Sequence, residues 1–187
     1  MLSKKELINY FEKGIKTDNN LKIGTEHEKF ILNKSTLKPI SYDEKNGIKD
    51  IFLSLINLGW KPIYNEKNDI ILGLNNNAQN ISLEPGGQLE LSGAALENIH
   101  QTCDEITHHL KQVKQLSTLH NFVSLGIGVE PTLHLNEFSS MPKERYTIMK
   151  NYMHKVGNNG LDMMYRTSST QVNLDFSSEL DMIKKFR

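Results

Sequence analysis

The stretch Gly24-Thr25-Glu26-His27-Glu28-Lys29-Phe30-Ile31-Leu32 places two carboxylates at alternate positions just before a run of apolar residues. Successive side chains of a β-strand point to opposite faces, so Glu26 and Glu28 share a face with Phe30 and Leu32. Because an unpaired carboxylate is costly to bury, this pair needs a cation, a basic partner or a solvent-filled cleft. An edge strand with both glutamates in solvent is the simpler alternative, since buried glutamate is rare.

Length, charge, cysteine content and the lengths of apolar runs limit the classes of protein to which this chain can belong. The 187 residues suffice for one domain, or for one domain and part of another, and the 22 Lys plus Arg residues balance the 22 Asp plus Glu residues. The basic residues within 143–145 and 184–187 are typical of helix surfaces, so we expect no nucleic-acid partner. A single cysteine, Cys103, excludes an internal disulfide framework. Without a membrane-length apolar run or a secretory signal, the sequence predicts a cytoplasmic protein that does not bind membranes.

Apolar periodicity and capping signals predict helices, which begin near Ser3, Asp43, Leu96, Pro142 and Ser178. The longest runs to Leu119, with an apolar stripe formed by Leu96, Ile99, Cys103, Ile106, Leu110 and Val113. In this interpretation Cys103 is a packed small hydrophobic residue. The histidines of this helix, His100, His108 and His109, are expected on its solvated side.

A hairpin is predicted between residues 80 and 92. Pro85 and Gly86 suit the two central positions of a type II turn, in which the second residue has a positive φ. Strand alternation places Glu84 before the turn, and Gln88 and Glu90 after it, on the face opposite the leucines.

A third strand is predicted within 168–176, with Gln171, Asn173 and Asp175 on one face and Val172, Leu174 and Phe176 towards the core. Alternation of helices with hairpins favours an α+β fold, an antiparallel sheet with helices on one face and a carboxylate-lined concave face opposite. Four converging glutamates would raise one another's pKa unless hard divalent cations such as Mg²⁺ neutralised them. A merely solvated sheet face is the alternative.

Several ordered motifs closely resemble the glutamate–cysteine ligase family of plants and proteobacteria. They are Gly24 to Phe30, Glu84 to Ala94, Leu96 to Cys103, Met141-Pro142-Lys143, Arg166-Thr167 and Gln171 to Phe176. The resemblance implies a glutamine-synthetase-like carboxylate sheet. Tyr165, Ser168 and Ser169 depart from the family pattern, and family members continue well past the equivalent of Arg187. The last predicted helix also ends in the middle of its apolar stripe. We therefore expect residues 1–187 to form the N-terminal part of a single catalytic domain, truncated at its C-terminus.

The resemblance implies an ATP-dependent ligase that joins the γ-carboxylate of L-glutamate to the amine of L-cysteine through an acyl phosphate. This reaction is the first step of glutathione biosynthesis, and the truncated chain is expected to be inactive alone. The alternatives are a catalytically silent glutamate- or nucleotide-binding module and a metal-dependent hydrolase. The sequence does not indicate an oligomeric state.

Site residues follow from the resemblance together with the predicted faces. Glu26, Glu28, Glu84 and Glu90 are expected to bind Mg²⁺. The amides of Gln88, Gln171 and Asn173 would orient glutamate or phosphate oxygens. As the candidate catalytic residue, Arg166 would pair with a carboxylate or phosphate, and its alternative is an ion pair with Asp162 or Glu179.

Overall fold

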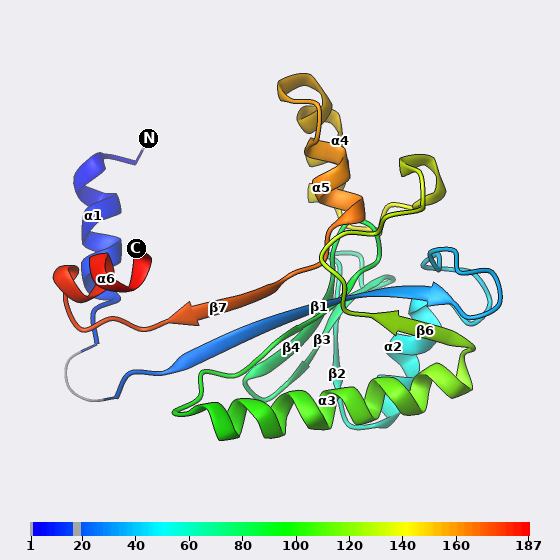
Figure 1. The fold of residues 1–187 in the computed structure, drawn as a ribbon, viewed down its shortest axis with the longest axis horizontal. Helices are drawn as coiled ribbons and strands as arrows, with labels where there is room; N and C mark the ends of the chain where they lie inside the picture. The colour runs from blue at the N-terminus through cyan, green and yellow to red at the C-terminus, as the bar shows by residue number, and fades with distance from the viewer. Residues whose placement is uncertain (1, 17–19) are drawn as a thin grey trace.

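A computed structural model describes residues 2–16 and 20–187, and its framework is a seven-stranded open sheet (Figure 1). The strands are β1 (Ile23–Asn33), β2 (Lys61–Tyr64), β3 (Ile71–Asn76), β4 (Gln79–Leu83), β5 (Leu89–Ser92), β6 (Phe122–Leu125) and β7 (Thr170–Leu174). They lie in the order β2-β3-β4-β5-β1-β6, β7 also pairs with β1, and all these pairings are antiparallel. The predicted antiparallel sheet, in a fold that mixes helices and strands, is confirmed.

Helices lie on both sides of this sheet, not on one. The helices are α1 (Lys4–Lys13), α2 (Ile48–Asn57), α3 (Ile99–Leu119), the 3-10 turn η1 (Leu135–Glu137), α4 (Glu144–Val156), α5 (Gly160–Arg166) and α6 (Glu179–Phe186). The main core lies between one sheet face and helices α2 and α3. A second cluster joins Phe30 and Leu32 to Met164 and Tyr165 near α5, and Figure 1 shows α4 and α5 rising on the side away from α3. The sequence predicted helices on one face of the sheet only, whereas the structure has helices on both faces.

Strand β1 lies at the centre because it pairs with three others. Glu26 to Lys29 pair with β5 on one side, while Ile23 to His27 pair with β7 and Phe30 to Asn33 pair with β6 on the other. The predicted alternation holds, since Ile31 packs in the main core and Phe30 in the second cluster. The glutamates of β1 consequently occupy the face opposite α3.

The hairpin between β4 and β5 forms at the predicted place, but with a different turn. The amide of Gly87 donates to the carbonyl of Glu84 at 2.9 Å, and the amide of Glu84 donates to the carbonyl of Gln88. The positive φ of +84° falls on Gly87 rather than on Gly86. This geometry is that of a three-residue loop whose last residue adopts the left-handed conformation, so the type II prediction was wrong.

Half of the predicted apolar stripe of α3 is exposed, although Val113 is buried as predicted. Ile99, Cys103 and Leu110 are exposed, and the residues that α3 turns towards the sheet include His109 and Gln112. Polar anchors set this rotation. Trp60 donates its indole N–H to Gln112 Oε1 at 3.3 Å, and Glu105 Oε1 accepts from the amide of Ala94 at 2.9 Å. Periodicity counts apolar residues only, so it cannot detect such anchors.

Strand β7 is also exposed, because its far end leaves the core. The predicted core residues Val172 and Leu174 are exposed, and together with Phe11 and Phe186 they line an open groove between α1 and α6. Figure 1 shows α1 and α6 side by side at the end of the β1–β7 ribbon, away from the main sheet. Residues 17–19, which follow α1, lie outside the described part of the chain. No helix among the described residues is long and apolar enough to span a membrane.

His109 is buried rather than solvated, and this corrects its predicted place. Its side chain is 2% exposed, and neither ring nitrogen has a hydrogen-bond partner among the described residues. Burial lowers the pKa of His109 to about 3, with the positive charge of Lys29 and then His27 and His108 adding to the effect. The imidazole of the folded chain is therefore neutral at neutral pH.

This burial predicts an acid-sensitive fold. Because the folded-state pKa lies below the ordinary value of 6.5, the stability that neutral His109 contributes is complete above pH 6.5 and falls as the pH drops towards 3. Below pH 6.5 the free energy of unfolding should fall by about 1.4 kcal/mol more per pH unit in the wild type than in His109→Gln, or about 2 kcal/mol in total between pH 7 and pH 5. Urea unfolding at pH 7 and pH 5 measures this difference. His100→Gln, an exposed change on the same helix, should follow the wild type, and parallel curves for all three proteins would refute the assignment.

Candidate functional site

The register of the sheet brings two of the predicted acids directly opposite each other. Glu28 on β1 pairs with Glu90 on β5, and Glu90 pairs in turn with Ser82 on β4. Residues directly opposite in antiparallel strands point to the same face, with Cβ atoms about 4.5–5.5 Å apart. Glu28 and Glu90 are thus forced into proximity by the backbone, whatever their side chains favour.

Glu84 joins this pair from the end of β4. The pKa of Glu84 is raised to about 7, first by burial and then by the charge of Glu90, a hydrogen bond with Glu90 and the charge of Glu28, while Arg145 opposes the rise. Burial also raises the pKa of Glu28, as do the charges of Glu90 and Glu26, although the amide of Ser169 donates to Glu28 Oε2 at 2.7 Å and opposes the rise. We call Glu28, Glu84 and Glu90 the carboxylate cluster. The structure brings these three predicted residues together.

Beside the cluster lies a hollow of about 280 Å³. Its lining includes Glu28, Glu84, Ser169 and the methionines Met149 and Met163. Within residues 2–16 and 20–187, no group of three or more His, Cys, Asp or Glu side chains is arranged so that it could hold a metal ion as it stands. The cluster therefore offers oxygen ligands without a preformed coordination shell.

Two basic residues at the start of α4 face the cluster. Arg145 Nη2 lies 3.8 Å from Glu84 Oε1, and Lys143 Nζ donates to the carbonyl of Leu83 at 2.8 Å. Both also contact the hydroxyl of Tyr146. Burial and then the charge of Arg145 lower the pKa of Lys143 to about 8. The prediction that these charges only cover a helix surface was wrong. The one sequence signal for this arrangement was the Met141-Pro142-Lys143 motif. It does not show which way the side chains of Lys143 and Arg145 point.

Gln88, a predicted substrate ligand, has its hydrogen-bonding groups engaged by the backbone. Its Nε2 donates to the carbonyls of Thr167 at 2.7 Å and Met164 at 3.3 Å, while its Oε1 accepts from the amide of Gly86 at 2.9 Å. The side chain is 1% exposed. These contacts hold the hairpin loop against the end of α5, so the observed role of Gln88 is structural.

The amides of β7 reach the remaining predicted acid. Asn173 Nδ2 donates to Glu26 Oε1 at 2.9 Å, and Gln171 Nε2 donates to Asn173 Oδ1 at 3.2 Å. Glu26 therefore lies at the side of the carboxylate cluster, connected to β7 by two exposed amide side chains. The predicted proximity of Glu26, Gln171 and Asn173 is present, and their functional roles stay predictions.

Arg166 is engaged elsewhere. Its Nη1 donates to Asp162 Oδ1 at 2.9 Å and its Nη2 to the carbonyl of Glu130 at 3.0 Å. The ion pair with Asp162 was the structural alternative weighed for this residue, and it is the arrangement observed. The predicted catalytic role of Arg166 has no support in these contacts.

Comparison with known proteins identifies one family. The model of "Glutamate-cysteine ligase family 2(GCS2)" matches residues 22–187. The chain is 52% identical over 187 residues to "Glutamate--cysteine ligase A, chloroplastic" of Oryza sativa subsp. japonica, covering 100% of the chain and 37% of that relative. It is 50% identical over 190 residues to "Glutamate--cysteine ligase, chloroplastic" of Arabidopsis thaliana, covering 100% of the chain and 35% of that relative. The chain thus spans little more than a third of the length of these curated relatives.

These names also correct one prediction. The relatives from rice, Arabidopsis thaliana and Medicago truncatula are all described as chloroplastic. The cytoplasmic location predicted from the sequence was therefore wrong, because the names point to the chloroplast.

The contacts of Gln88 predict a large effect on stability. Gln88→Met should lower the free energy of unfolding by about 2–4 kcal/mol, because buried backbone groups of the hairpin loop and of α5 lose their partners. Urea unfolding measures the loss. Gln171→Met, the matched change at an exposed amide, should shift the value by less than about 0.5 kcal/mol. Equal values for both variants would show that Gln88 does not hold these elements together.

Because the carboxylates of the cluster repel one another, removing one of their charges should raise the free energy of unfolding, in contrast to Gln88→Met. The folded-state pKa of Glu84, about 7, lies above its ordinary value of 4.5, so ionised Glu84 destabilises the fold increasingly as the pH rises from 4.5 through 7. Glu84→Gln should therefore be more stable than the wild type by about 1 kcal/mol at pH 8 with a chelator present, after allowance for solvent screening. At pH 5 the difference should disappear. Glu44→Gln, at an exposed loop, is the control, and a destabilised Glu84→Gln at pH 8 would contradict the assigned repulsion.

Proposed function

The chain belongs to glutamate-cysteine ligase family 2, and we propose that it forms the N-terminal, phosphate-binding part of an ATP-dependent ligase. In the proposed reaction the γ-carboxylate of L-glutamate attacks the γ-phosphate of ATP, which gives an acyl phosphate and ADP. The amine of L-cysteine then displaces phosphate, and γ-glutamylcysteine results. This is the first step of glutathione biosynthesis. The remaining two thirds of the relatives' length would supply what this part lacks.

One observation carries the proposal. Three glutamates from β1, β5 and the end of β4 meet on one sheet face, although burial and then the charges of Glu90 and Glu28 raise the pKa of Glu84 to about 7. A fold that only required stability would be improved by replacing one of these acids, so their occurrence together indicates a site. The arrangement also supports the glutamine-synthetase-like carboxylate sheet as the finer description of the fold.

Magnesium fits the chemistry of this donor set. Carboxylate oxygens are ligands that Mg²⁺ prefers, and Mg²⁺ commonly uses one or two of them while keeping water and substrate phosphates. Full coordination by three protein side chains is therefore not required, which agrees with the absence of a preformed shell among the described residues. When bound, the cation would neutralise charge on the phosphate oxygens.

The other residues of the site bind and orient anions. Arg145 has an exposed side chain 3.8 Å from Glu84, so its guanidinium can turn to a phosphate or carboxylate oxygen without leaving the site. Lys143 adds a second positive charge, held by the carbonyl of Leu83. The amide of Asn173 next to Glu26 can donate to a substrate oxygen. Positioning two anionic reactants beside these fixed charges is the main requirement of the reaction.

Calorimetric titration of the 187-residue chain with ATP in the presence of Mg²⁺ tests the proposal. Glu28→Gln should weaken binding at least about tenfold, which corresponds to the loss of one charged ligand, while Glu44→Gln should leave it unchanged. Binding that is equal in all three proteins would contradict the site. A longer ligase should further release phosphate only when glutamate and cysteine are both present, whereas a metal-dependent hydrolase would release it from ATP alone.

A further inference from the structure

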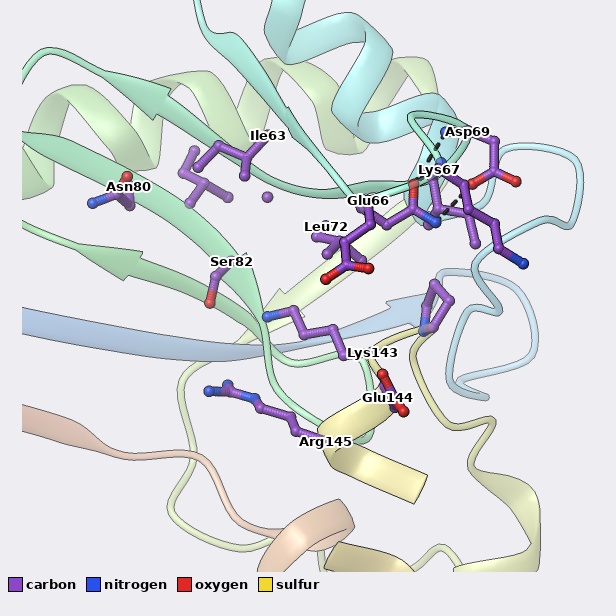
Figure 2. A pocket seen from close by; sticks show the side chains of 15 residues that line it. Ile63, Glu66, Lys67, Asp69, Leu72, Asn80, Ser82, Lys143, Glu144 and Arg145 are labelled. Carbon is purple, nitrogen blue, oxygen red and sulfur yellow. Dashed lines mark hydrogen bonds between the residues drawn. The ribbon is translucent and has the colours of Figure 1, made fainter. Parts of the chain in front are cut away.

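Tyr146 is a buried residue on which both basic side chains of the site converge. Lys143 Nζ donates to the hydroxyl oxygen of Tyr146 at 3.2 Å, and Arg145 Nη2 donates to the same oxygen at 3.0 Å. Figure 2 shows the side chains of Lys143 and Arg145 extending in the same direction from the start of α4. Tyr146 itself is only 1% exposed, so it is shielded from any ligand at the carboxylate cluster. One neutral oxygen, placed behind the site, is therefore a shared acceptor for two cations.

The aromatic ring of Tyr146 contacts the same two cations. Lys143 Nζ lies 5.3 Å from the ring centroid, and Arg145 Cζ lies 4.9 Å from it. A cation within about 6 Å of an aromatic centroid is attracted by the ring. The ring and the hydroxyl of Tyr146 consequently both hold Lys143 and Arg145 near the end of β4.

The hydroxyl group of Tyr146 is oriented by the strand that carries Glu84. Burial raises the pKa of Tyr146 to about 12, so the hydroxyl stays protonated at neutral pH. It donates its proton to the carbonyl of Leu83, the residue directly before Glu84. Because the proton points to Leu83, the lone pairs of the oxygen are left to accept from Lys143 and Arg145. The direction of both cations is therefore tied to the position of Glu84.

Arg145 depends on Tyr146 more than Lys143 does. The two cations repel each other, and burial and then the charge of Arg145 lower the pKa of Lys143 to about 8. Lys143 has a second acceptor in the carbonyl of Leu83, at 2.8 Å. Besides Tyr146, Arg145 has a longer contact of 3.8 Å with Glu84 Oε1, and its side chain is 62% exposed. Without the hydroxyl, the guanidinium of Arg145 should move away from Lys143 into solvent.

We propose that Tyr146 is a positioning residue, which holds Arg145, and to a smaller extent Lys143, beside the carboxylate cluster before an anionic ligand arrives. This inference rests on the proposed function, since it requires an anion at the cluster. Ordering a long charged side chain costs conformational entropy, and a side chain that is already ordered does not add that cost to binding. Tyr146 thus sets the affinity for an anion that it does not touch.

Nuclear magnetic resonance of the arginine side chains tests the positioning without any ligand. The chain contains three arginines, Arg145, Arg166 and Arg187, so few signals have to be assigned. In the wild type the two Nη groups of Arg145 should give separate signals, because the charge-assisted hydrogen bond at Nη2 slows rotation of the guanidinium. Tyr146→Phe keeps the ring but removes the hydroxyl. The Nη signals of Arg145 should then merge, like those of the exposed Arg187.

Tyr165→Phe is the matched control. Tyr165 is also buried, with 3% exposure, and its hydroxyl lies 2.6 Å from Ser140 Oγ. Its loss removes one tyrosine hydroxyl of a similar kind, away from Lys143 and Arg145. The Nη signals of Arg145 should stay separate in this variant.

Titration of the 187-residue chain with inorganic tripolyphosphate and Mg²⁺ tests the consequence for binding. Tyr146→Phe should weaken binding about fivefold, and Tyr165→Phe less than twofold. In an Arg145→Ala background, Tyr146→Phe should change the affinity less than about twofold, because the side chain through which Tyr146 acts is missing. A merely structural role of Tyr146 would weaken binding equally in both backgrounds.

The outcomes separate this inference from the function on which it rests. If the wild type binds tripolyphosphate but Tyr146→Phe does not weaken binding, or weakens it equally with and without Arg145, only this inference fails. Merged Nη signals of Arg145 in the wild type, or separate signals in Tyr146→Phe, would also overturn it. If the wild type does not bind tripolyphosphate, the proposed function fails and the inference fails with it. Should Tyr146→Phe not fold, the wild-type signals of Arg145 decide.

Discussion

The site depends on one constraint: backbone hydrogen bonds between adjacent strands hold carboxylates that repel each other close together. The antiparallel register places Glu28 opposite Glu90, and the hydrogen bonds of β1 and β5 prevent the two strands from moving apart. Local donors relieve the repulsion only partly. Ser92 Oγ donates to Glu90 Oε1 at 2.6 Å and the amide of Ser169 donates to Glu28. In the proposed function, this remaining unfavourable charge is what attracts cations and cation-bound phosphates to the cluster.

The surrounding structure keeps these charges in position. Gln88 connects the hairpin loop, which lies between Glu84 and Glu90, to the end of α5 through buried hydrogen bonds. Tyr146 donates to the carbonyl of Leu83, directly before Glu84, and this contact fixes the start of α4 against the sheet. Lys143 and Arg145 are thereby held beside the carboxylate cluster. The polar network and the second apolar cluster around Phe30 thus form one support for the site.

Strand alternation predicted the parts of the site that depend on neighbouring residues in sequence. It placed Glu26 and Glu28 on one face of β1 and identified the hairpin with Glu84 and Glu90, because a period of two is imposed by the backbone itself. It failed for features that depend on contacts between residues far apart in the sequence. The rotation of α3 depends on Gln112 and Glu105, whose partners lie on other elements, and the direction of Arg145 depends on where α4 meets the sheet. The resemblance to a ligase family added ATP to the Mg²⁺ that the carboxylates already suggested. The roles that it implied for Gln88 and Arg166 stay predictions, and the observed contacts of both side chains are with the fold.

Paramagnetic broadening by Mn²⁺ in place of Mg²⁺ tests the central claim most directly. If the cation binds at the carboxylate cluster, amide signals within residues 27–29 and 83–91 should broaden first in a titration of the isotopically labelled chain. The same titration of Glu28→Gln should lose this selectivity. Broadening that centres on other acidic segments, such as the loop around Glu44, or that is identical in the variant, would contradict the account.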